Sequence, residues 1–212
     1  MLNVCEIFTS IQGESGLTGL PCTFIRLSGC NLQCVWCDTA YSRLESGNKM
    51  SIEQILREVS KSHVNLVEIT GGEPLLQKDT AALCKELLQN KYSVMIETNG
   101  TLDISVLDSK VKRIVDIKCP GSGAGDSFLI DNIKRLTKND EVKFVVSSVE
   151  DAGWAKKFCE EYDLSKKCAV IFSPVMGMLS PDTLAGWLIK SGLDARLGIQ
   201  LHKVIWGDAR GR

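Results

Sequence analysis

The sequence lacks an excess of charge of either sign. Lys and Arg together number 25 against 26 Asp and Glu, which gives a formal net charge of -1. A chain without a basic surplus has no positive field with which to attract a nucleic-acid backbone or an anionic membrane surface. We therefore expect a small-molecule partner and no association with nucleic acid.

Long apolar runs are also missing. No uncharged segment approaches the roughly 20 apolar residues that cross a bilayer, and no charged leader followed by an apolar stretch opens the chain. We expect a cytoplasmic protein without a membrane partner. Internal repeats and linkers are absent too, and 212 residues bury enough surface for one domain, which we expect to span residues 1–212.

Histidine is scarce, with only His63 and His202, whereas cysteine is abundant. The nine cysteines are odd in number, and Cys30, Cys34 and Cys37 fall within eight positions. This crowding does not suit a secreted disulfide framework and favours ligation of a metal or a cluster. The other six cysteines are scattered singly, and we expect them to behave as small buried apolar residues.

Apolar, β-branched segments alternate along the chain with segments of helical periodicity. Helices are expected to begin after Ser51, Asp151 and Ser180, which suit N-terminal caps, and another is expected over residues 79–89. The alternation predicts an α/β fold with parallel strands, and its six or seven units predict a partial or compact (β/α) barrel. The expected strands are Cys22–Leu27, Leu66–Thr70, Val94–Glu97, Arg113–Ile117, Val142–Val146, Ala169–Phe172 and Leu197–Leu201.

The three clustered cysteines follow the first of these strands with spacings of four and three residues. A structural zinc site normally needs four ligands, and neither histidine continues the motif. Ferredoxin-type clusters use four thiolates, and no local fourth cysteine is present. Three thiolates on a four-iron cubane leave one iron open. The alternative is that a distant residue such as Cys119 completes an ordinary zinc or electron-transfer site.

This C-x3-C-x2-C pattern after a strand resembles the signature of the radical S-adenosylmethionine (SAM) superfamily. The resemblance implies a [4Fe-4S] cluster on Cys30, Cys34 and Cys37, SAM on the open iron, a 5′-deoxyadenosyl radical, and an electron donor of the flavodoxin or ferredoxin type. The segment Gly71–Pro74 resembles the second motif of the superfamily, although a bare turn would also favour its two glycines. The SAM contacts implied are Trp36, Cys37, Asp38, Gly72, Glu73, Asn99, Asp116, Ile117 and Lys118. Relatives often carry Ser-Pro-Lys at the end of this set, so Asp116 and Ile117 depart from the pattern.

A narrower resemblance, to the 7-carboxy-7-deazaguanine synthase family, rests on the order and spacing of four fragments: Phe8–Glu14, Phe24–Cys30, Trp36–Thr39 and Gln200–Lys203. It implies a carbon–nitrogen lyase that contracts 6-carboxy-5,6,7,8-tetrahydropterin to 7-carboxy-7-deazaguanine with loss of ammonia, in queuosine and other 7-deazapurine biosynthesis. It also implies a homodimer.

The substrate of that family is a flat, amide-rich heterocycle with a carboxylate. Arg26 suits the carboxylate because its guanidinium forms two parallel charge-assisted hydrogen bonds. The implied substrate contacts are Ile11, Gln12, Gly13, Glu14, Arg26, Thr70, Glu97 and His202, and the resemblance makes the hydroxyl of Thr39 a ligand of Mg2+. Alternatively, Gln12 and Glu14 are turn residues and His202 is structural.

Two other functions fit the cysteine motif. A glycyl-radical activase shares the size and the cluster, but it usually continues the last cysteine with His-Asn, where this chain has Asp38 and Thr39. A non-catalytic iron–sulfur or zinc module would transfer electrons or hold a partner.

Overall fold

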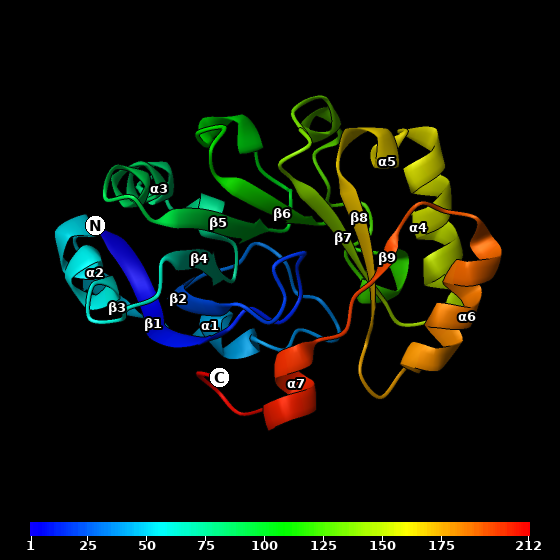
Figure 1. Ribbon diagram of the computed structural model, residues 1–212, viewed down its shortest axis with the longest axis horizontal. Helices are drawn as coiled ribbons and strands as arrows, with labels where there is room; N and C mark the ends of the chain where they lie inside the picture. The colour runs from blue at the N-terminus through cyan, green and yellow to red at the C-terminus, as the bar shows by residue number, and fades with distance from the viewer.

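A nine-stranded sheet runs through the whole chain in the computed structural model, which describes residues 1–212 (Figure 1). The strand order is β3-β1-β2-β4-β5-β6-β7-β8-β9, with β1 antiparallel to β2 and β3 and every pair from β2 to β9 parallel. Because β3 and β9 do not pair, the sheet stays open, and the predicted α/β partial barrel is confirmed. The strands are β1 Leu2–Ile11, β2 Pro21–Leu27, β3 Asn48–Met50, β4 Leu66–Gly71, β5 Ser93–Thr98, β6 Lys112–Asp116, β7 Glu141–Val146, β8 Ala169–Pro174 and β9 Arg196–Leu197.

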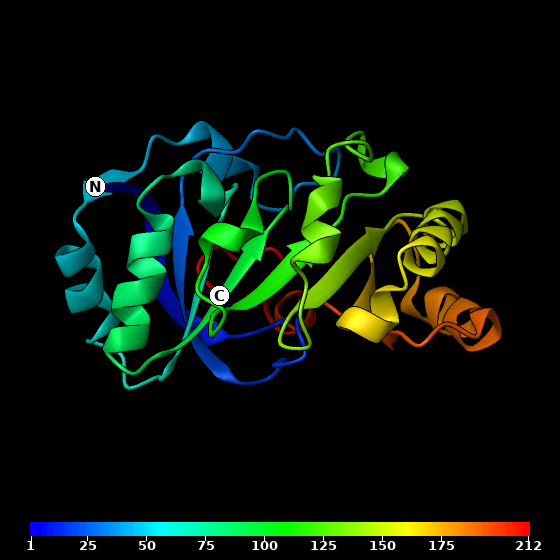
Figure 2. The same ribbon diagram turned by 90° about the horizontal axis from the view of Figure 1, so that it is seen from above.

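The sheet arches, and the helices lie on two sides of it. In Figures 1 and 2, α2 to α6 lie along the outer side, whereas α1, α7 and the loop after β2 lie inside the arch. No helix has both the length and the apolar character that a membrane crossing requires. The helices are α1 Ala40–Leu44, α2 Ile52–Val59, α3 Thr80–Gln89, α4 Val149–Glu161, α5 Leu164–Lys167, α6 Pro181–Ser191 and α7 Leu201–Trp206.

Alternation along the strands separates an apolar outer face from a polar inner one. On β4, Val67 and Ile69 belong to the core that α2 and α3 cover, so Glu68 between them faces inward. On β7, Phe144 belongs to the core beneath α4 and α6, so its neighbour Lys143 also faces inward. The inner face of the sheet therefore carries charged side chains that are nonetheless buried.

The inner face of the sheet is apolar near the amino ends of the strands. Cys22, Leu66, Met95 and Ile114 form a small buried cluster near the start of β2, β4, β5 and β6. This cluster fills the inner side of the sheet at the amino ends of the strands. The polar side chains that face inward therefore lie nearer the carboxyl ends. That is the end at which the active face of such a fold is expected.

Three details of the predicted fold are wrong. Leu2–Ile11 is a strand that the sequence pattern did not reveal, because most of its residues are only partly buried and its place depends on antiparallel pairing with β2. The expected strand Leu197–Leu201 is only two residues long, and Leu201 instead opens α7. The connections from β5 to β7 contain only short 3-10 turns instead of the expected helices.

The cap of α4 also differs from the prediction. Ser148, not Asp151, is the N-cap, and its hydroxyl accepts the backbone N–H of Asp151. The carboxylate of Asp151 instead accepts the backbone N–H groups of Gly121 and Ser147. Asp151 thus fixes the loop after β6 to the start of the helix.

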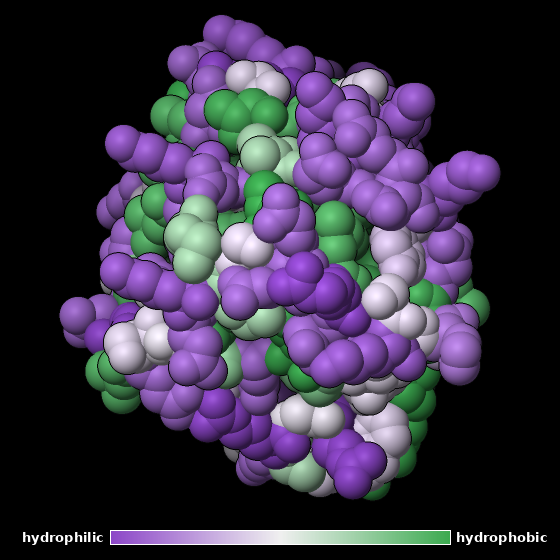
Figure 3. All heavy atoms as spheres, turned by 90° about the vertical axis from the view of Figure 1, so that its left-hand side faces the viewer, coloured by the Kyte–Doolittle hydropathy of each residue, from purple (hydrophilic) through white to green (hydrophobic).

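The face at the left of Figure 1, where the N-terminus and α2 lie, is mainly hydrophilic. Figure 3 shows hydrophobic residues there only as separate patches among polar ones. The free β3 edge of the sheet lies on this side.

Candidate active site

A cavity of about 470 Å³ opens on the inner side of the arch, at the carboxyl ends of the strands. Most of the residues predicted for the site line it, including the three clustered cysteines. Those that do so are Ile11, Gln12, Gly13, Glu14, Arg26, Cys30, Cys34, Trp36, Cys37, Asp38, Thr39, Thr70, Gly72, Glu97, Asn99, Asp116, Lys118 and His202. Residues far apart in the sequence thus meet in one place.

The cysteine loop is held against the turn after β4. The backbone N–H of Glu73 donates to the carbonyl of Gly29 at 2.8 Å, and that of Gly72 donates to the carbonyl of Leu27 at 3.2 Å. A Cβ on Gly71 or Gly72 would lie 2.1 Å from the carbonyl oxygen of Leu27 or Gly29, respectively. The two glycines are therefore required by close backbone packing beneath the first cysteine.

The sulfurs of Cys30, Cys34 and Cys37 suit a cluster better than a zinc ion. No other cysteine lines the cavity, and Cys119 is fully buried in the core of the outer face. In a tetrahedral zinc site with zinc–sulfur bonds of about 2.3 Å, the sulfurs stand about 3.8 Å apart. These three do not all lie within 4.8 Å of one another. The donor set fits a larger group with three protein thiolates.

Two predicted SAM contacts do not reach the cavity. Glu73 is fully buried, and its carboxylate accepts the hydroxyl of Thr98 at 2.8 Å and the backbone N–H of Asn99 at 2.7 Å. Burial raises the pKa of Glu73 although these hydrogen bonds oppose the shift. Ile117 is fully buried in the outer core. Their side chains are therefore engaged inside the protein, and contacts of these two residues with SAM remain predictions for their backbone atoms.

The residues around Cys30 continue onto neighbouring strand ends. The amide of Asn99 donates to the side-chain oxygen of Asn31 at 3.1 Å and lies 4.0 Å from the Cys30 sulfur. After β6, the Lys118 ammonium lies 2.9 Å from the carboxylate of Asp116. The second carboxylate oxygen of Asp116 is buried without a hydrogen-bond partner. This side of the cavity therefore offers both a cation and a free acceptor.

Arg26 on β2 is held in place by one of its guanidinium N–H groups, and its other N–H groups are not used. Its Nε donates to Glu6 on β1 at 2.8 Å, and the hydroxyl of Tyr41 donates to the same oxygen at 2.7 Å. The terminal nitrogens of Arg26 make no hydrogen bond with the protein, and its guanidinium also stacks over the ring of Phe8. The side chain is 14% exposed, so it is not a solvated edge arginine. Its fork is free to bind an anion in the cavity.

The C-terminal tail packs against Glu6, the residue that holds Arg26. Arg210 donates to the second carboxylate oxygen of Glu6 at 3.1 Å and to Glu45 through both terminal nitrogens at 2.8 Å. Its guanidinium also lies 4.1 Å above the ring of Tyr41. No local sequence pattern predicts this contact, because Arg210 and Glu6 lie near opposite ends of the chain.

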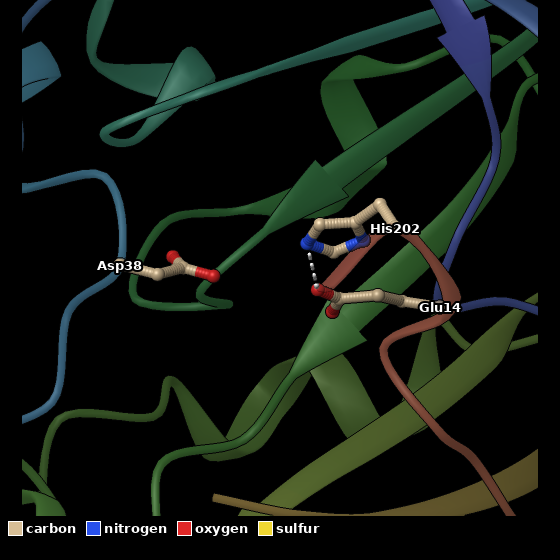
Figure 4. Close-up of side chains that lie close together, drawn as sticks. All are labelled: Glu14, Asp38 and His202. Carbon is tan, nitrogen blue, oxygen red and sulfur yellow. Dashed lines mark ion pairs between the residues drawn. The ribbon is translucent and has the colours of Figure 1, made fainter. Parts of the chain in front are cut away.

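On the other side of the cavity, α7 lies against the loop after β1. The backbone N–H of Leu201 donates to the carbonyl of Gly13, and a Cβ on Gly13 would lie 2.3 Å from Nδ1 of His202. Glu14 accepts the amide of Gln200 at 2.7 Å and lies 3.8 Å from Nε2 of His202 (Figure 4). The small size of Gly13 therefore permits the histidine to lie beside Glu14.

Glu14, Asp38 and His202 bring their polar atoms within 4.8 Å of one another, as Figure 4 shows. Both carboxylates already have a cation, because Lys143 lies 2.6 Å from Glu14 and Lys203 lies 3.3 Å from Asp38. The group is therefore an ion-pair network within the cavity.

Gln12 supports the loop chiefly through its own side chain. Its amide oxygen accepts the backbone N–H groups of Glu14 and Ser15 at 3.0 and 2.9 Å, and its amide nitrogen donates to Glu68 at 3.3 Å. The side chain of Gln12 is therefore fully engaged within the protein. Burial, and then the charge of Glu97, raise the pKa of Glu68 to about 8.

Lys143 and Glu68 are cavity residues that the sequence analysis did not identify. Burial would lower the pKa of Lys143, but the carboxylates of Glu14, Glu97 and Asp116 raise it well above its usual value. Burial would likewise raise the pKa of Glu14, but Lys143 and His202 reverse this and lower it to about 2. The signal available for each of them was a charged residue between two apolar neighbours within a strand.

Thr39 precedes α1 as its N-cap residue, but its hydroxyl makes no capping bond. The nearest polar partner of that hydroxyl is the Cys37 sulfur, at 4.0 Å. Thr39 lines the cavity, and its hydroxyl is not used to cap the helix.

Comparison with known proteins agrees with this arrangement. The radical SAM superfamily matches residues 24–122. The 7-carboxy-7-deazaguanine synthases of Koribacter versatilis and Chlorobaculum tepidum are each 43% identical to this chain, over 97% and 99% of it and 97% of each relative. The chain belongs to the 7-carboxy-7-deazaguanine synthase family. The crystal structure of QueE from Escherichia coli superposes with a TM-score of 0.77 at 25% identity, covering 95% of this chain and 94% of that one.

Membership in this family confirms the resemblance inferred from the four sequence fragments. The chain is a radical SAM enzyme, and its superfamily implies a [4Fe-4S] cluster, SAM and a reductant. The cavity is lined both by the three clustered cysteines and by Arg26.

Proposed function

We propose that this chain converts 6-carboxy-5,6,7,8-tetrahydropterin to 7-carboxy-7-deazaguanine with release of ammonia. The observation that carries the proposal is one cavity shared by three unpaired thiolates and an arginine with a free guanidinium fork. A radical source and a carboxylate anchor in the same cavity suit a substrate that must be held while its ring is rearranged.

In this proposal, Cys30, Cys34 and Cys37 hold the cluster. When bound, the cluster and SAM supply a carbon radical that removes a hydrogen atom from the substrate. Gly72 leaves room beside Cys30, Asn99 orients its amide toward the loop, and Lys118 and Asp116 offer a cation and an acceptor to the polar groups of SAM. Trp36 and Asp38 cover the loop from the side of the cavity.

The substrate lies, in this proposal, between Arg26 and the loop after β1. Arg26 binds its carboxylate through the terminal nitrogens that Glu6 leaves free. The backbone of Ile11–Glu14, with Thr70, Glu97 and His202, faces the amide edge of the heterocycle and offers both donors and acceptors.

We further propose that Mg2+ binds beside Thr39 and the substrate carboxylate. Magnesium prefers hard oxygens, keeps several waters and often takes few protein ligands. The uncapped hydroxyl of Thr39 meets that requirement. The proposal also includes a homodimer, a cytoplasmic location and a flavodoxin or ferredoxin as electron donor.

The substrate proposal is tested by comparing two pterins with the reconstituted enzyme under anaerobic conditions. The carboxylated tetrahydropterin is expected to give deazapurine, whereas the same ring without the carboxylate is expected to bind about 10- to 100-fold more weakly, because it loses a charge-assisted bidentate pair. Equal turnover of both pterins would show that Arg26 does not bind the substrate carboxylate.

The magnesium proposal is tested with Thr39→Val and Thr39→Ser. Valine removes the oxygen at nearly constant volume and is expected to abolish stimulation by Mg2+, while serine keeps it. Full stimulation in Thr39→Val would contradict the proposal.

A non-catalytic module is the alternative of a different class. Electron paramagnetic resonance of the reduced cluster separates the two, because SAM changes the spectrum of a cluster with an open iron. An unchanged spectrum would favour the module.

A further inference from the structure

Lys143 is a buried cation in the middle of the cavity wall. Its side chain is 2% exposed, and it projects from β7 between Val142 and Phe144, which pack into the outer core. An apolar residue would fill such a position at lower cost, because a buried ion pair often stabilises a fold less than apolar residues of similar volume. The charge therefore calls for an explanation other than packing.

Three carboxylates from three separate elements converge on the Lys143 ammonium. Glu14, in the loop after β1, lies 2.6 Å from it, and Asp116, at the end of β6, lies 3.4 Å from it. The carboxylate of Glu97 on β5 is the third partner, and it accepts a hydrogen bond from the ammonium. The ammonium donates hydrogen bonds to Glu14 and Glu97, and Asp116 is held as an ion pair without a hydrogen bond.

These three partners come from both of the residue groups proposed above, the one for the pterin and the one for SAM. Glu14 and Glu97 belong to the wall proposed for the substrate, and Asp116 belongs, with Lys118, to the wall proposed for SAM. A single side chain therefore fixes the position of acceptors on both walls. The remaining charged groups that face this cluster are Glu68 on β4, Lys118 after β6 and His202 on α7.

We infer that Lys143 is a positioning residue that holds the substrate-side carboxylates Glu14 and Glu97 and the SAM-side carboxylate Asp116 in one fixed arrangement, and so sets SAM and the pterin at reacting distance. The inference rests on the proposed function. Its physical basis is that a displacement of about 1 Å between reacting groups costs a rate factor of about 100.

Loss of the ammonium would leave three carboxylates in a buried site. Their mutual repulsion would separate them or force them to take up protons, and both outcomes would loosen the two walls. A radical formed without a well-placed substrate would be quenched unproductively. We therefore expect the ratio of 5′-deoxyadenosine to deazapurine formed by the enzyme to rise.

The experiment compares Lys143→Met with the matched control Lys112→Met. Lys112 on β6 also pairs with a buried carboxylate, Glu141, at 2.9 Å, but neither residue lines the cavity. Lys143→Met is expected to lower kcat/KM by about 10- to 100-fold for SAM and for the pterin, with a larger excess of 5′-deoxyadenosine over product. The acid limb of its pH profile should move to higher pH, because Glu14 and Glu97 lose the cation that favours their charged forms. Lys112→Met should keep the wild-type KM values, ratio and profile.

Lys143→Arg keeps the positive charge, and it tests the positioning role of Lys143 if Lys143→Met does not fold. Its planar fork directs donors differently from an ammonium, so a folded protein with a raised 5′-deoxyadenosine ratio is expected. Unchanged KM values, ratio and pH profile in the variant that folds, with only less folded protein, would overturn the inference. Absence of deazapurine from wild-type enzyme in the same assay would instead reject the proposed function.

Discussion

The backbone of Gly72 lies so close to that of Gly29 that a Cβ on Gly72 would stand 2.1 Å from the carbonyl oxygen of Gly29 and 2.7 Å from the Cβ of Cys30. Two motifs that are separate in the sequence therefore form one rigid unit. The position of Cys30 depends on the absence of a side chain at Gly72, 42 residues later in the chain.

Gly72→Ala should accordingly weaken cluster binding. The obstacle is backbone, which cannot turn away as a flexible side chain would, so we expect a loss of about 1–3 kcal/mol in the free energy of unfolding and less iron for each chain after anaerobic reconstitution. Gly153→Ala is the matched control, because nothing lies within 4 Å of its added Cβ in α4. It should retain full iron content and gain about 0.5–1 kcal/mol. Equal iron content in the two variants would show that the contact is not needed.

Much of the fold and site follows from local sequence patterns. The apolar strands and the cysteine loop at the end of β2 were predictable because each is encoded within a few neighbouring residues. β1 was not predictable, since half-buried residues and antiparallel pairing leave a weak pattern.

The role of Glu73 and the presence of Lys143 in the site depend on contacts between distant strands. Glu73 sits in a SAM motif, yet its carboxylate turns toward Thr98 and the backbone of Asn99. Lys143 meets acceptors from three other elements. Single-sequence patterns specify which residues are charged, but the sheet topology decides which charges meet.

Arg210 should affect substrate binding through Glu6. Its removal frees one oxygen of the carboxylate that also anchors Arg26. Because the ion pair is exposed, we expect Arg210→Ala to raise the KM for the pterin by only about two- to fivefold, with the KM for SAM unchanged. Arg57→Ala, an exposed arginine on α2, is the control. An equal change in the KM for SAM would argue for a general disturbance of the tail.

Glu68 predicts how stability depends on pH. Its pKa is about 8 in the folded protein against an ordinary 4.5, so between these values the folded chain holds a proton that the unfolded chain has released. The free energy of unfolding must therefore fall as pH rises through this window, by up to about 1.4 kcal/mol per pH unit. Glu68→Gln removes the titration and should make the fall shallower.

Urea unfolding at several pH values within that window checks the prediction on samples of equal iron content. Glu14 does not interfere, because its pKa of about 2 is below the ordinary value of 4.5. Its contribution to stability is complete above pH 4.5 and is lost only as pH falls from there toward 2. Identical slopes for wild type and Glu68→Gln would contradict the assignment.

The central claim is that one cavity both initiates the radical and holds the pterin carboxylate, and anaerobic turnover tests it most directly. Reconstituted protein with SAM, reductant, Mg2+ and 6-carboxy-5,6,7,8-tetrahydropterin should release ammonia and 7-carboxy-7-deazaguanine in equal amounts. A protein with an intact cluster that cleaves SAM but forms no deazapurine would contradict it.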